Sequence, residues 1–146
     1  MLLFAAAMWA LNHYAPVLMV ISEPWRRLGW GVMAIAPLAP IAAFIQFRQA
    51  HTTVNPHKPE AATELVTSGV YAWTRNPMYL GLAILLLGWA IRLGTLSPFA
   101  GPLLFMPLMQ HAQIVPEEDA LRSKFGRDYH EYCYRVNRWL GRKPHA

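Results

Sequence analysis

The chain has 146 residues, of which 55% are hydrophobic and 14% charged, and its net charge is +5. Typical soluble domains have about 25% charged residues, and long stretches here have none, which argues against a soluble protein with apolar core helices. The basic residues flank apolar stretches and form no separate domain, which disfavours nucleic-acid binding. The single cysteine, Cys133, cannot form an intramolecular disulfide.

Four apolar stretches predict four membrane-spanning helices, because a helix needs roughly 20 mostly apolar residues to cross the hydrocarbon core. In chain order the predicted spans are 2–21, 28–47, 77–93 and 96–115. Pro16, Pro37 and Pro40 lie inside the first two spans and are expected to kink them, which membrane helices tolerate.

The chain is predicted to form one all-α, integral membrane domain, 1–146. Its expected parts are a first helical hairpin (1–47), a cytoplasmic loop (48–76), a second hairpin (77–115) and a C-terminal helix and tail (116–146). The hairpins are expected to turn at Ser22-Glu23-Pro24 and near Gly94-Thr95, with Ser97-Pro98 opening the last span.

An apolar stripe follows Pro116 at helical spacing. It consists of Leu121, Phe125, Tyr129, Tyr132, Val136 and Leu140, while the charged residues face elsewhere. This pattern predicts an amphipathic helix, broken at Gly126, that packs on the hairpins or lies on the membrane surface.

Lys and Arg are unevenly distributed along the chain. An even number of spans places both termini and the loop 48–76 on one side, which holds ten of the 13 basic residues. The other side has Arg26, Arg27 and Arg92. Basic residues accumulate in cytoplasmic segments, so we expect the termini and the loop to lie in the cytoplasm.

A polar segment around Arg75-Asn76-Pro77 precedes the third span. Asn76 is a good N-cap and Pro77 a good first helical residue, so the pair could simply start a helix. Arg75 is left as a fixed cation at the helix mouth, where exposed backbone N–H groups also favour a small carboxylate. Spacing alone leaves both interpretations open.

A second polar segment, Pro116-Glu117-Glu118-Asp119, follows the fourth span. Acidic residues in a first helical turn favour the helix dipole. Alternatively, one carboxylate could pair with an ammonium group or a ribose hydroxyl. Successive helical side chains point about 100° apart, so at most one of Glu117 and Glu118 can face a pocket.

Together the two segments resemble the isoprenylcysteine carboxyl methyltransferase family, which is related to membrane phospholipid N-methyltransferases. The family pattern is Leu-Val-x-x-Gly-x-Tyr-x-x-x-Arg-His/Asn-Pro-x-Tyr-x-Gly, then, after an apolar hairpin, Glu-Glu-x-x-Leu-x-x-x-Phe-Gly-x-x-Tyr-x-x-Tyr. The chain reads LVTSGVYAWTRNPMYLG from Leu65 and EEDALRSKFGRDYHEY from Glu117. It looks like a short bacterial-type member, over about residues 44–140.

The resemblance implies an all-α membrane fold that binds S-adenosylmethionine at the cytoplasmic face, in bacteria at the inner membrane. It assigns no catalytic residue and no metal. Carried over by position, the cofactor-binding residues are Thr63, Glu64, Leu65, Val66, Tyr71, Arg75, Asn76, Pro77, Met78, Tyr79, Glu117 and Glu118. Arg75 is expected either to hold the methionine carboxylate or to brace the loop.

The implied activity is methyl transfer to a lipophilic acceptor, such as the carboxylate of a prenylcysteine-like molecule. Two positions depart from the family: Asn76 stands where the prenylcysteine enzymes usually have His, and Gln113 stands where they have a substrate-binding Arg. The acceptor could therefore be a lipid amine, a small thiol or another lipid. The rival interpretation is a non-catalytic membrane binding protein.

Overall fold

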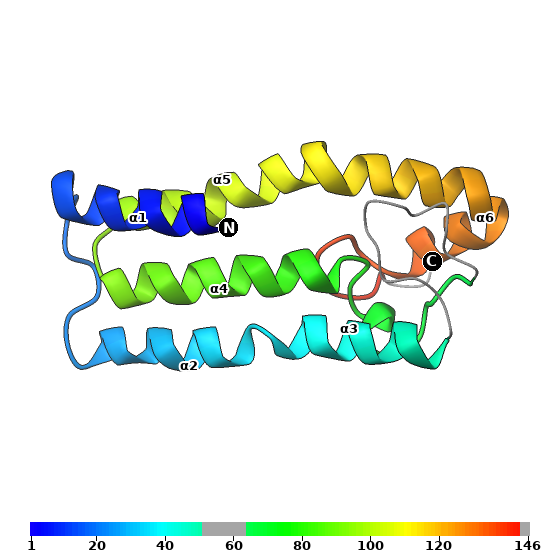
Figure 1. The fold of residues 1–146 in the computed structure, drawn as a ribbon, viewed down its shortest axis with the longest axis horizontal. Helices are drawn as coiled ribbons and strands as arrows, with labels where there is room; N and C mark the ends of the chain where they lie inside the picture. The colour runs from blue at the N-terminus through cyan, green and yellow to red at the C-terminus, as the bar shows by residue number, and fades with distance from the viewer. Residues whose placement is uncertain (51–63, 144–146) are drawn as a thin grey trace. The chain divides into compact units, whose positions relative to one another are not determined.

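A computed structural model of the chain describes residues 1–50 and 64–143 (Figure 1). Over these residues the chain is all-helical and has no strand, which confirms the predicted all-α class. In chain order the elements are α1 (Leu2–Tyr14), η1 (Trp25–Arg27), α2 (Leu28–Ile35), α3 (Leu38–Gln49), η3 (Gly69–Ala72), α4 (Pro77–Leu93), η4 (Ser97–Phe99), α5 (Ala100–Met109), η5 (Gln110–Ile114) and α6 (Val115–Arg135).

The first helix is shorter than predicted. The helix expected over 2–21 ends at Tyr14, because Pro16 disfavours the α conformation of the residue before it. Helix α1 has 13 residues and is therefore about 20 Å long, against a hydrocarbon core of about 30 Å. The residues after it form no helix and instead bond across to Gly94, whose carbonyl accepts from the N–H groups of Val20 and Ile21.

The second predicted span is the one described helix that is long and apolar enough to cross a membrane, Trp25–Gln49. Its local break between α2 and α3 confirms the kink expected at Pro37, since a proline ring clashes with the preceding helical turn. Only 17% of its most apolar window is buried inside the protein. A core helix of a soluble protein would be mostly buried, so this apolar surface is available to lipid.

The third and fourth predicted spans differ in how well their bounds were predicted. Helix α4 occupies 77–93, as predicted, and is a shorter apolar helix. The span expected over 96–115 instead consists of η4, α5 and the π-helical turn η5. It runs into α6 without a break at Pro116, which takes one of the first positions of α6, where a proline needs no N–H partner.

The chain forms two compact units, the first from Met1–Pro37 and Gly81–Leu108 and the second from Leu38–Leu80 and Met109–Ala146. In the first unit, helices approach closely at small residues. A Cβ on Gly29 would lie 2.5 Å from the carbonyl oxygen of Gly88, so only glycine permits this contact between α2 and α4. Helix α1 packs on α5, where the rings of Phe4 and Phe105 meet edge to face at 5.5 Å.

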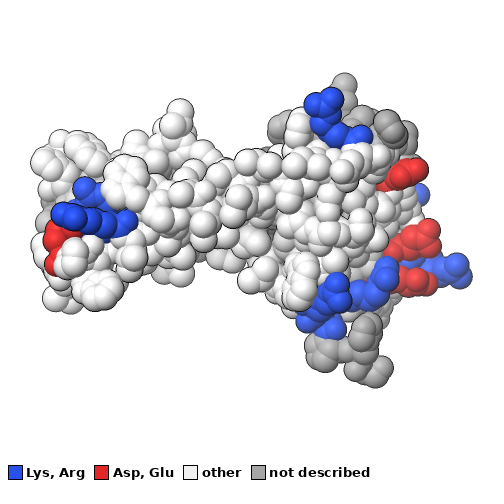
Figure 2. All heavy atoms as spheres, turned by 90° about the horizontal axis from the view of Figure 1, so that it is seen from below, with Lys and Arg blue, Asp and Glu red and all other residues white. Residues whose placement is uncertain are grey.

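The first unit has four charged residues, Glu23, Arg26, Arg27 and Arg92. Figure 2 shows them gathered at one end of that unit, whose remaining surface in this view is uncharged. They are held together by an ion pair of 3.8 Å between Arg92 and Glu23 and by a hydrogen bond from Arg26 to the Arg92 carbonyl. A charged end beside an apolar surface is the pattern expected at a membrane–water boundary.

The core of the second unit is aromatic. Its buried residues are Ala43, Tyr71, Tyr129, Tyr132 and Val136. Helix α6 is interrupted at Gly126, at φ 50° and ψ −117°, which confirms the predicted break. The helix expected to continue to Leu140 ends at Arg135, and Val136 is extended. The predicted helix is therefore too long at its C-terminal end, and Val136 enters the core from a non-helical segment.

Candidate functional site

The loop before α4 is fixed on α3 by one glycine and one tyrosine. Gly69 has φ +55°, a conformation that other residues adopt only with strain, and the end of the Gln46 side chain of α3 occupies the place that a Cβ would take. Two residues later, Tyr71 is buried, and its ring packs on that of Phe47 at 5.3 Å. The loop therefore has a fixed path toward Arg75.

The Arg75-Asn76-Pro77 turn begins α4, as the sequence predicts. Pro77 is the first helical residue, and the Asn76 carbonyl accepts from the N–H of Leu80 at 2.9 Å. The side chain of Asn76 also bonds outside the helix. It is buried, and its Nδ2 donates to the carbonyl of Arg138 at 3.0 Å. Asn76 thus joins the turn to the C-terminal segment.

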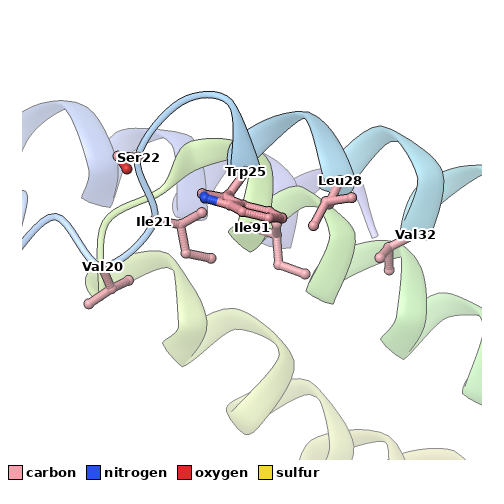
Figure 3. Close-up of a pocket in the computed structure, with 7 residues that line it drawn as sticks. All are labelled: Val20, Ile21, Ser22, Trp25, Leu28, Val32 and Ile91. Carbon is pink, nitrogen blue, oxygen red and sulfur yellow. The ribbon is translucent and has the colours of Figure 1, made fainter.

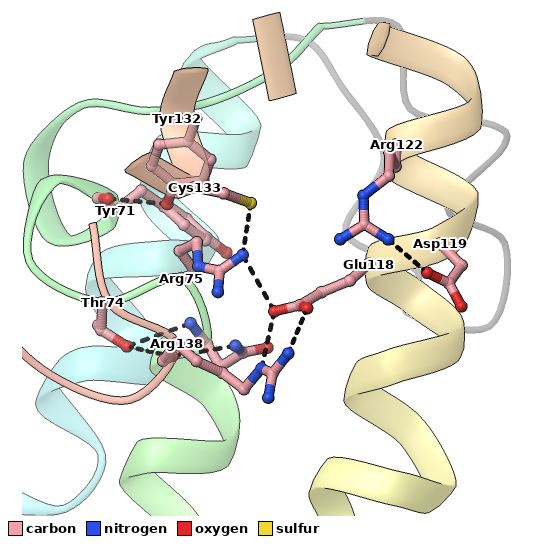
Figure 4. A network of polar contacts seen from close by, with 10 residues as sticks. Tyr71, Thr74, Arg75, Glu118, Asp119, Arg122, Tyr132, Cys133 and Arg138 are labelled. Carbon is pink, nitrogen blue, oxygen red and sulfur yellow. Dashed lines mark hydrogen bonds and ion pairs between the residues drawn. The ribbon is translucent and has the colours of Figure 1, made fainter. Parts of the chain in front are cut away.

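A buried carboxylate lies between two guanidinium groups (Figure 4). Glu118 is 3.1 Å from Nη1 of Arg75, and these two side chains are 6% and 9% exposed. Arg138 binds the same carboxylate in a bidentate manner, with Nε at 3.0 Å and Nη2 at 2.7 Å. The Arg75 guanidinium also donates to Cys133 Sγ. Its Nε is buried and has no partner among the described residues.

Electrostatics within this network favour the charged guanidinium. The hydrogen bonds to Glu118 raise the pKa of Arg138 above its ordinary value, although partial burial opposes this shift. Burial is the main cause that raises the pKa of Tyr129, and the charge of Glu118 adds to it. The site therefore holds protonated tyrosines beside a paired carboxylate at neutral pH.

The other glutamate of the pair faces tyrosines instead. Glu117 accepts a hydrogen bond from the hydroxyl of Tyr79, at 2.5 Å from oxygen to oxygen. Burial, followed by the charge of Glu117, raises the pKa of Tyr71. Glu117 is half-buried and Glu118 is buried. Successive positions on α6 thus direct the two carboxylates to different partners.

Most residues assigned from the family resemblance lie in the second unit. Arg75, Tyr79, Glu117 and Glu118 are brought together by the contacts above, although the two motifs are about 40 residues apart in the sequence. The half-buried Leu65 and Val66 pack against the aromatic core, Met78 is half-buried, and Glu64 is exposed. Thr63 lies outside the described residues.

Gln113, the position predicted to contact the acceptor, lies in the π-helical turn η5 and is half-buried. It precedes Glu117 by four residues on a continuous helical run, hence by about one turn. π-Helical turns occur frequently at functional sites, and the acceptor contact of Gln113 stays a prediction. The sequence itself gives no sign of the π geometry.

Arg138 belongs to the network around Glu118, although the sequence patterns give it no place in a site. By sequence it is only one of the basic residues that indicate membrane orientation. Its partner Glu118 is 20 residues away. Helix α6 ends between the two residues, and the apolar stripe gives no sign of this end. A helical spacing rule cannot identify such a pair, because the two side chains meet through a change in chain direction.

A pocket of about 450 Å³ lies in the first unit, away from both motifs in the sequence (Figure 3). It is lined by Val20, Ile21, Ser22, Trp25, Leu28, Val32 and Ile91. This lining is apolar except for the hydroxyl of Ser22 and the indole N–H of Trp25, and it suits a hydrocarbon chain better than a zwitterion. No residue assigned to the cofactor lines it.

Some residues of the second unit have the chemistry that S-adenosylmethionine would need. Glu117 is a half-buried carboxylate that can meet an ammonium group or a ribose hydroxyl, with the apolar side chains of Leu65 and Val66 in the same unit. Arg75 is already paired with the buried Glu118. Of its two predicted roles, the geometry favours bracing the loop over binding the methionine carboxylate.

Comparison with known proteins finds one matching family model and several relatives. A family model described as phospholipid methyltransferase matches residues 25–128. The protein-S-isoprenylcysteine O-methyltransferase of Schizosaccharomyces pombe is 28% identical over 91% of the chain and 56% of its own length. A Delta(14)-sterol reductase of Mus musculus is also 28% identical, over 93% of the chain and 36% of its own length.

A protein of Haemophilus influenzae is 41% identical over 63 residues, which are 43% of the chain and all of that protein. The chain spans about half the length, or less, of the yeast and mouse relatives. No solved structure matches the chain.

Proposed function

Because the chain belongs to the phospholipid methyltransferase family, we propose that it is an integral membrane enzyme that moves a methyl group from S-adenosylmethionine to a lipophilic acceptor. The family inferred from the two sequence motifs, a family of methyltransferases, is confirmed by this match. The proposal depends on one observation: the Arg75 turn and the glutamate pair are joined by two direct contacts, Arg75 to Glu118 and Tyr79 to Glu117.

The membrane part of the proposal is supported by exposed apolar surface. The long helix Trp25–Gln49 is largely unburied, and large side chains such as Leu103 (71% exposed) lie on the surface of α5. The proposal includes all four spans predicted from the sequence, with α1 and the residues after it making the first crossing. The distribution of Lys and Arg supports an orientation with both termini and the site in the cytoplasm.

Within the proposed site, each group has a separate task. The cofactor supplies a methyl group on a sulfonium that leaves as a neutral thioether. Glu117, fixed by Tyr79, offers its carboxylate to the ammonium group or a ribose hydroxyl. Arg75 and Glu118 hold the loop in place. Alignment of donor and acceptor contributes most of the rate in such a displacement, because no acid is required.

The acceptor that we favour is a prenylcysteine-like carboxylate, which needs no base before it attacks. The name of the yeast relative supports this choice. A lipid amine is the alternative, supported by the description of the family model, and it would have to be unprotonated. The name of the mouse relative, a reductase, indicates that this region of sequence also occurs in proteins with other chemistry. Transfer of the methyl label itself is therefore the required readout.

The test uses the purified chain in lipid nanodiscs with methyl-labelled S-adenosylmethionine. We expect label in an extractable lipid or in a prenylcysteine analogue, and thermal stabilisation by S-adenosylhomocysteine. Glu117→Gln should weaken both, whereas Glu131→Gln, an exposed change on the same helix, should alter neither. No stabilisation and no labelled product in the wild type would contradict the proposal and favour a non-catalytic binding protein.

A further inference from the structure

The C-terminal segment 136–142 lies beyond residues 25–128, to which the family match extends. We propose that this segment, which we term the C-terminal clasp, forms part of the cofactor site, and that Arg138 is its positioning residue. This inference rests on the proposed function and deepens it: the clasp holds the Arg75 turn and the glutamate helix in the arrangement that binds the cofactor. Three sets of contacts support it.

The clasp is a closed turn and not a loose tail. Val136 and Arg142 form an antiparallel bridge, and the N–H of Asn137 donates to the carbonyl of Gly141 at 2.9 Å. Gly141 has φ +98°, a conformation that favours glycine. The N–H of Lys143 returns to the carbonyl of Arg135 at 3.0 Å, at the end of α6. These bonds fix the backbone of the segment and therefore the direction of its carbonyl groups.

These carbonyl groups bind the loop 72–76 along its length. The Asn137 carbonyl accepts from the N–H of Arg75 at 3.2 Å, and the Arg138 carbonyl accepts from Asn76 Nδ2 at 3.0 Å. In the reverse direction, the N–H of Gly141 donates to the carbonyl of Trp73 at 2.7 Å. The guanidinium of Arg142 lies 4.9 Å from the centre of the Trp73 ring. The turn is thus bonded to the clasp through the backbone of Trp73 and Arg75 and through the side chain of Asn76.

The side chain of Arg138 connects the clasp to α6. It binds both oxygens of Glu118, which in turn pairs with Arg75. Arg138 therefore reaches the turn through its carbonyl and the glutamate helix through its guanidinium. Glu117, the proposed cofactor contact, is the neighbour of Glu118 on α6. Loss of the Arg138 side chain should leave Glu118 with one partner and allow Glu117 to shift.

The experiment compares Arg138→Ala, Arg138→Lys and the control Arg127→Ala in the full chain in nanodiscs. Arg127 is also a paired arginine, but its side chain is 87% exposed and its ion-pair partner, Glu131, lies on the same helix. We expect Arg138→Ala to raise the KM for S-adenosylmethionine roughly tenfold or more, the effect of losing charged hydrogen bonds, with a much smaller change in kcat. Lysine should restore part of the affinity, and the control should behave as the wild type.

Amide hydrogen exchange over residues 72–77 gives a second readout that does not depend on activity. Arg138→Ala should speed exchange of the Arg75 amide, because the bond from its N–H to the Asn137 carbonyl of the clasp should loosen. If Arg138→Ala does not fold, Arg138→Gln provides the same comparison, because glutamine removes the guanidinium but keeps much of the side-chain length. A variant with wild-type KM and wild-type exchange would overturn the inference.

The failure of the proposed function would be recognised separately. A wild-type chain that neither binds S-adenosylhomocysteine nor transfers a methyl group would overturn the proposed function, and the cofactor role of the clasp with it. Hydrogen exchange would still show whether the clasp holds the turn. Wild-type activity with an unchanged Arg138→Ala variant would overturn only the role of Arg138.

Discussion

The two units of the chain are held together by different kinds of contact. In the first unit, helices approach at glycines, the charged residues are confined to one end, and large apolar side chains are exposed. In the second unit, a carboxylate and two guanidinium groups meet, with Glu118 and Arg75 almost fully buried. Close helix contacts through small residues suit a lipid environment, where apolar burial supplies no driving force between helices. Buried ion pairs suit a site whose geometry must be fixed.

Buried ion pairs generally add little stability, because the cost of removing two charges from water offsets their attraction. The network around Glu118 is therefore better explained as a device that fixes the positions of the segments it joins than as a source of stability. It joins the turn before α4 to helix α6 and the C-terminal clasp, which follow more than 40 residues later in the sequence. The following predictions test this contrast between the units.

The largest effect should come from Glu118→Ala. The substitution leaves Arg75 and Arg138 without their shared carboxylate, and removal of one partner from a buried pair costs about 3–5 kcal/mol. We expect a large fall in the thermal unfolding temperature in detergent and loss of stabilisation by S-adenosylhomocysteine. The control is Asp119→Ala, whose exposed pair with Arg122, 2.7 Å long, is worth less than about 1 kcal/mol. Equal effects of the two substitutions would contradict a structural role for the buried network.

Alkaline pH should destabilise the second unit through its buried tyrosines. Burial is the main cause that raises the pKa of Tyr71, Tyr129 and Tyr132 above the ordinary value of 10.0. Above that pH the unfolded chain loses these protons while the folded chain keeps them. Stability is therefore complete below pH 10 and falls as the pH rises, by about 1.4 kcal/mol per pH unit for each such tyrosine.

Tyrosinate absorbance and circular dichroism, recorded together during an alkaline titration, test this prediction. The absorbance of these three residues should appear only as helical structure is lost. Tyr129→Phe should reduce the pH dependence of stability by the share of one tyrosine. Ionisation of all tyrosines with the fold intact would contradict the prediction.

A smaller effect is expected where helices α2 and α4 meet in the first unit. A Cβ at position 29 would lie 2.5 Å from the Gly88 carbonyl oxygen and 2.7 Å from the Arg92 nitrogen, whereas a Cβ on Gly31 would have nothing within 4 Å. Gly29→Ala should therefore cost about 1–3 kcal/mol through overpacking. Gly31→Ala should be neutral or stabilising, by about 0.5–1 kcal/mol. The unfolding temperature in detergent measures both. Equal destabilisation would mean that the helices do not meet at Gly29.

Parts of this architecture could be predicted because local chemistry determines them. The bounds of α4 follow from Asn76-Pro77 at its start and Gly94, at φ +87°, just past its end. The break at Gly126 follows from the conformational freedom of glycine. The proximity of the two motifs came from the family resemblance and is matched by the contacts of Arg75 and Tyr79 with the glutamate pair.

Other parts depend on contacts between distant segments, which periodicity cannot detect. Val136 continues the apolar stripe in the sequence, but it leaves the helix because the segment after it bonds to the loop before α4. Asn76 is a residue type that commonly caps helices, and its side-chain amide in addition donates to the carbonyl of Arg138. Both hydrogen-bonded contacts join residues that are far apart in the sequence, so no local pattern reveals them.

The smallest effect is expected from Val32→Trp, which places a large side chain in the apolar pocket of the first unit. The pocket is lined by no residue of either motif, so the affinity for S-adenosylhomocysteine should stay at the wild-type value. Stability should change by less than about 1.5 kcal/mol, because added apolar volume occupies space that is already open. Isothermal titration in nanodiscs measures the affinity, with Val32→Leu as the control of smaller volume. A fall in affinity with tryptophan alone would mean that the apolar pocket and the polar site are coupled, and the separation of tasks between the units would then have to be abandoned.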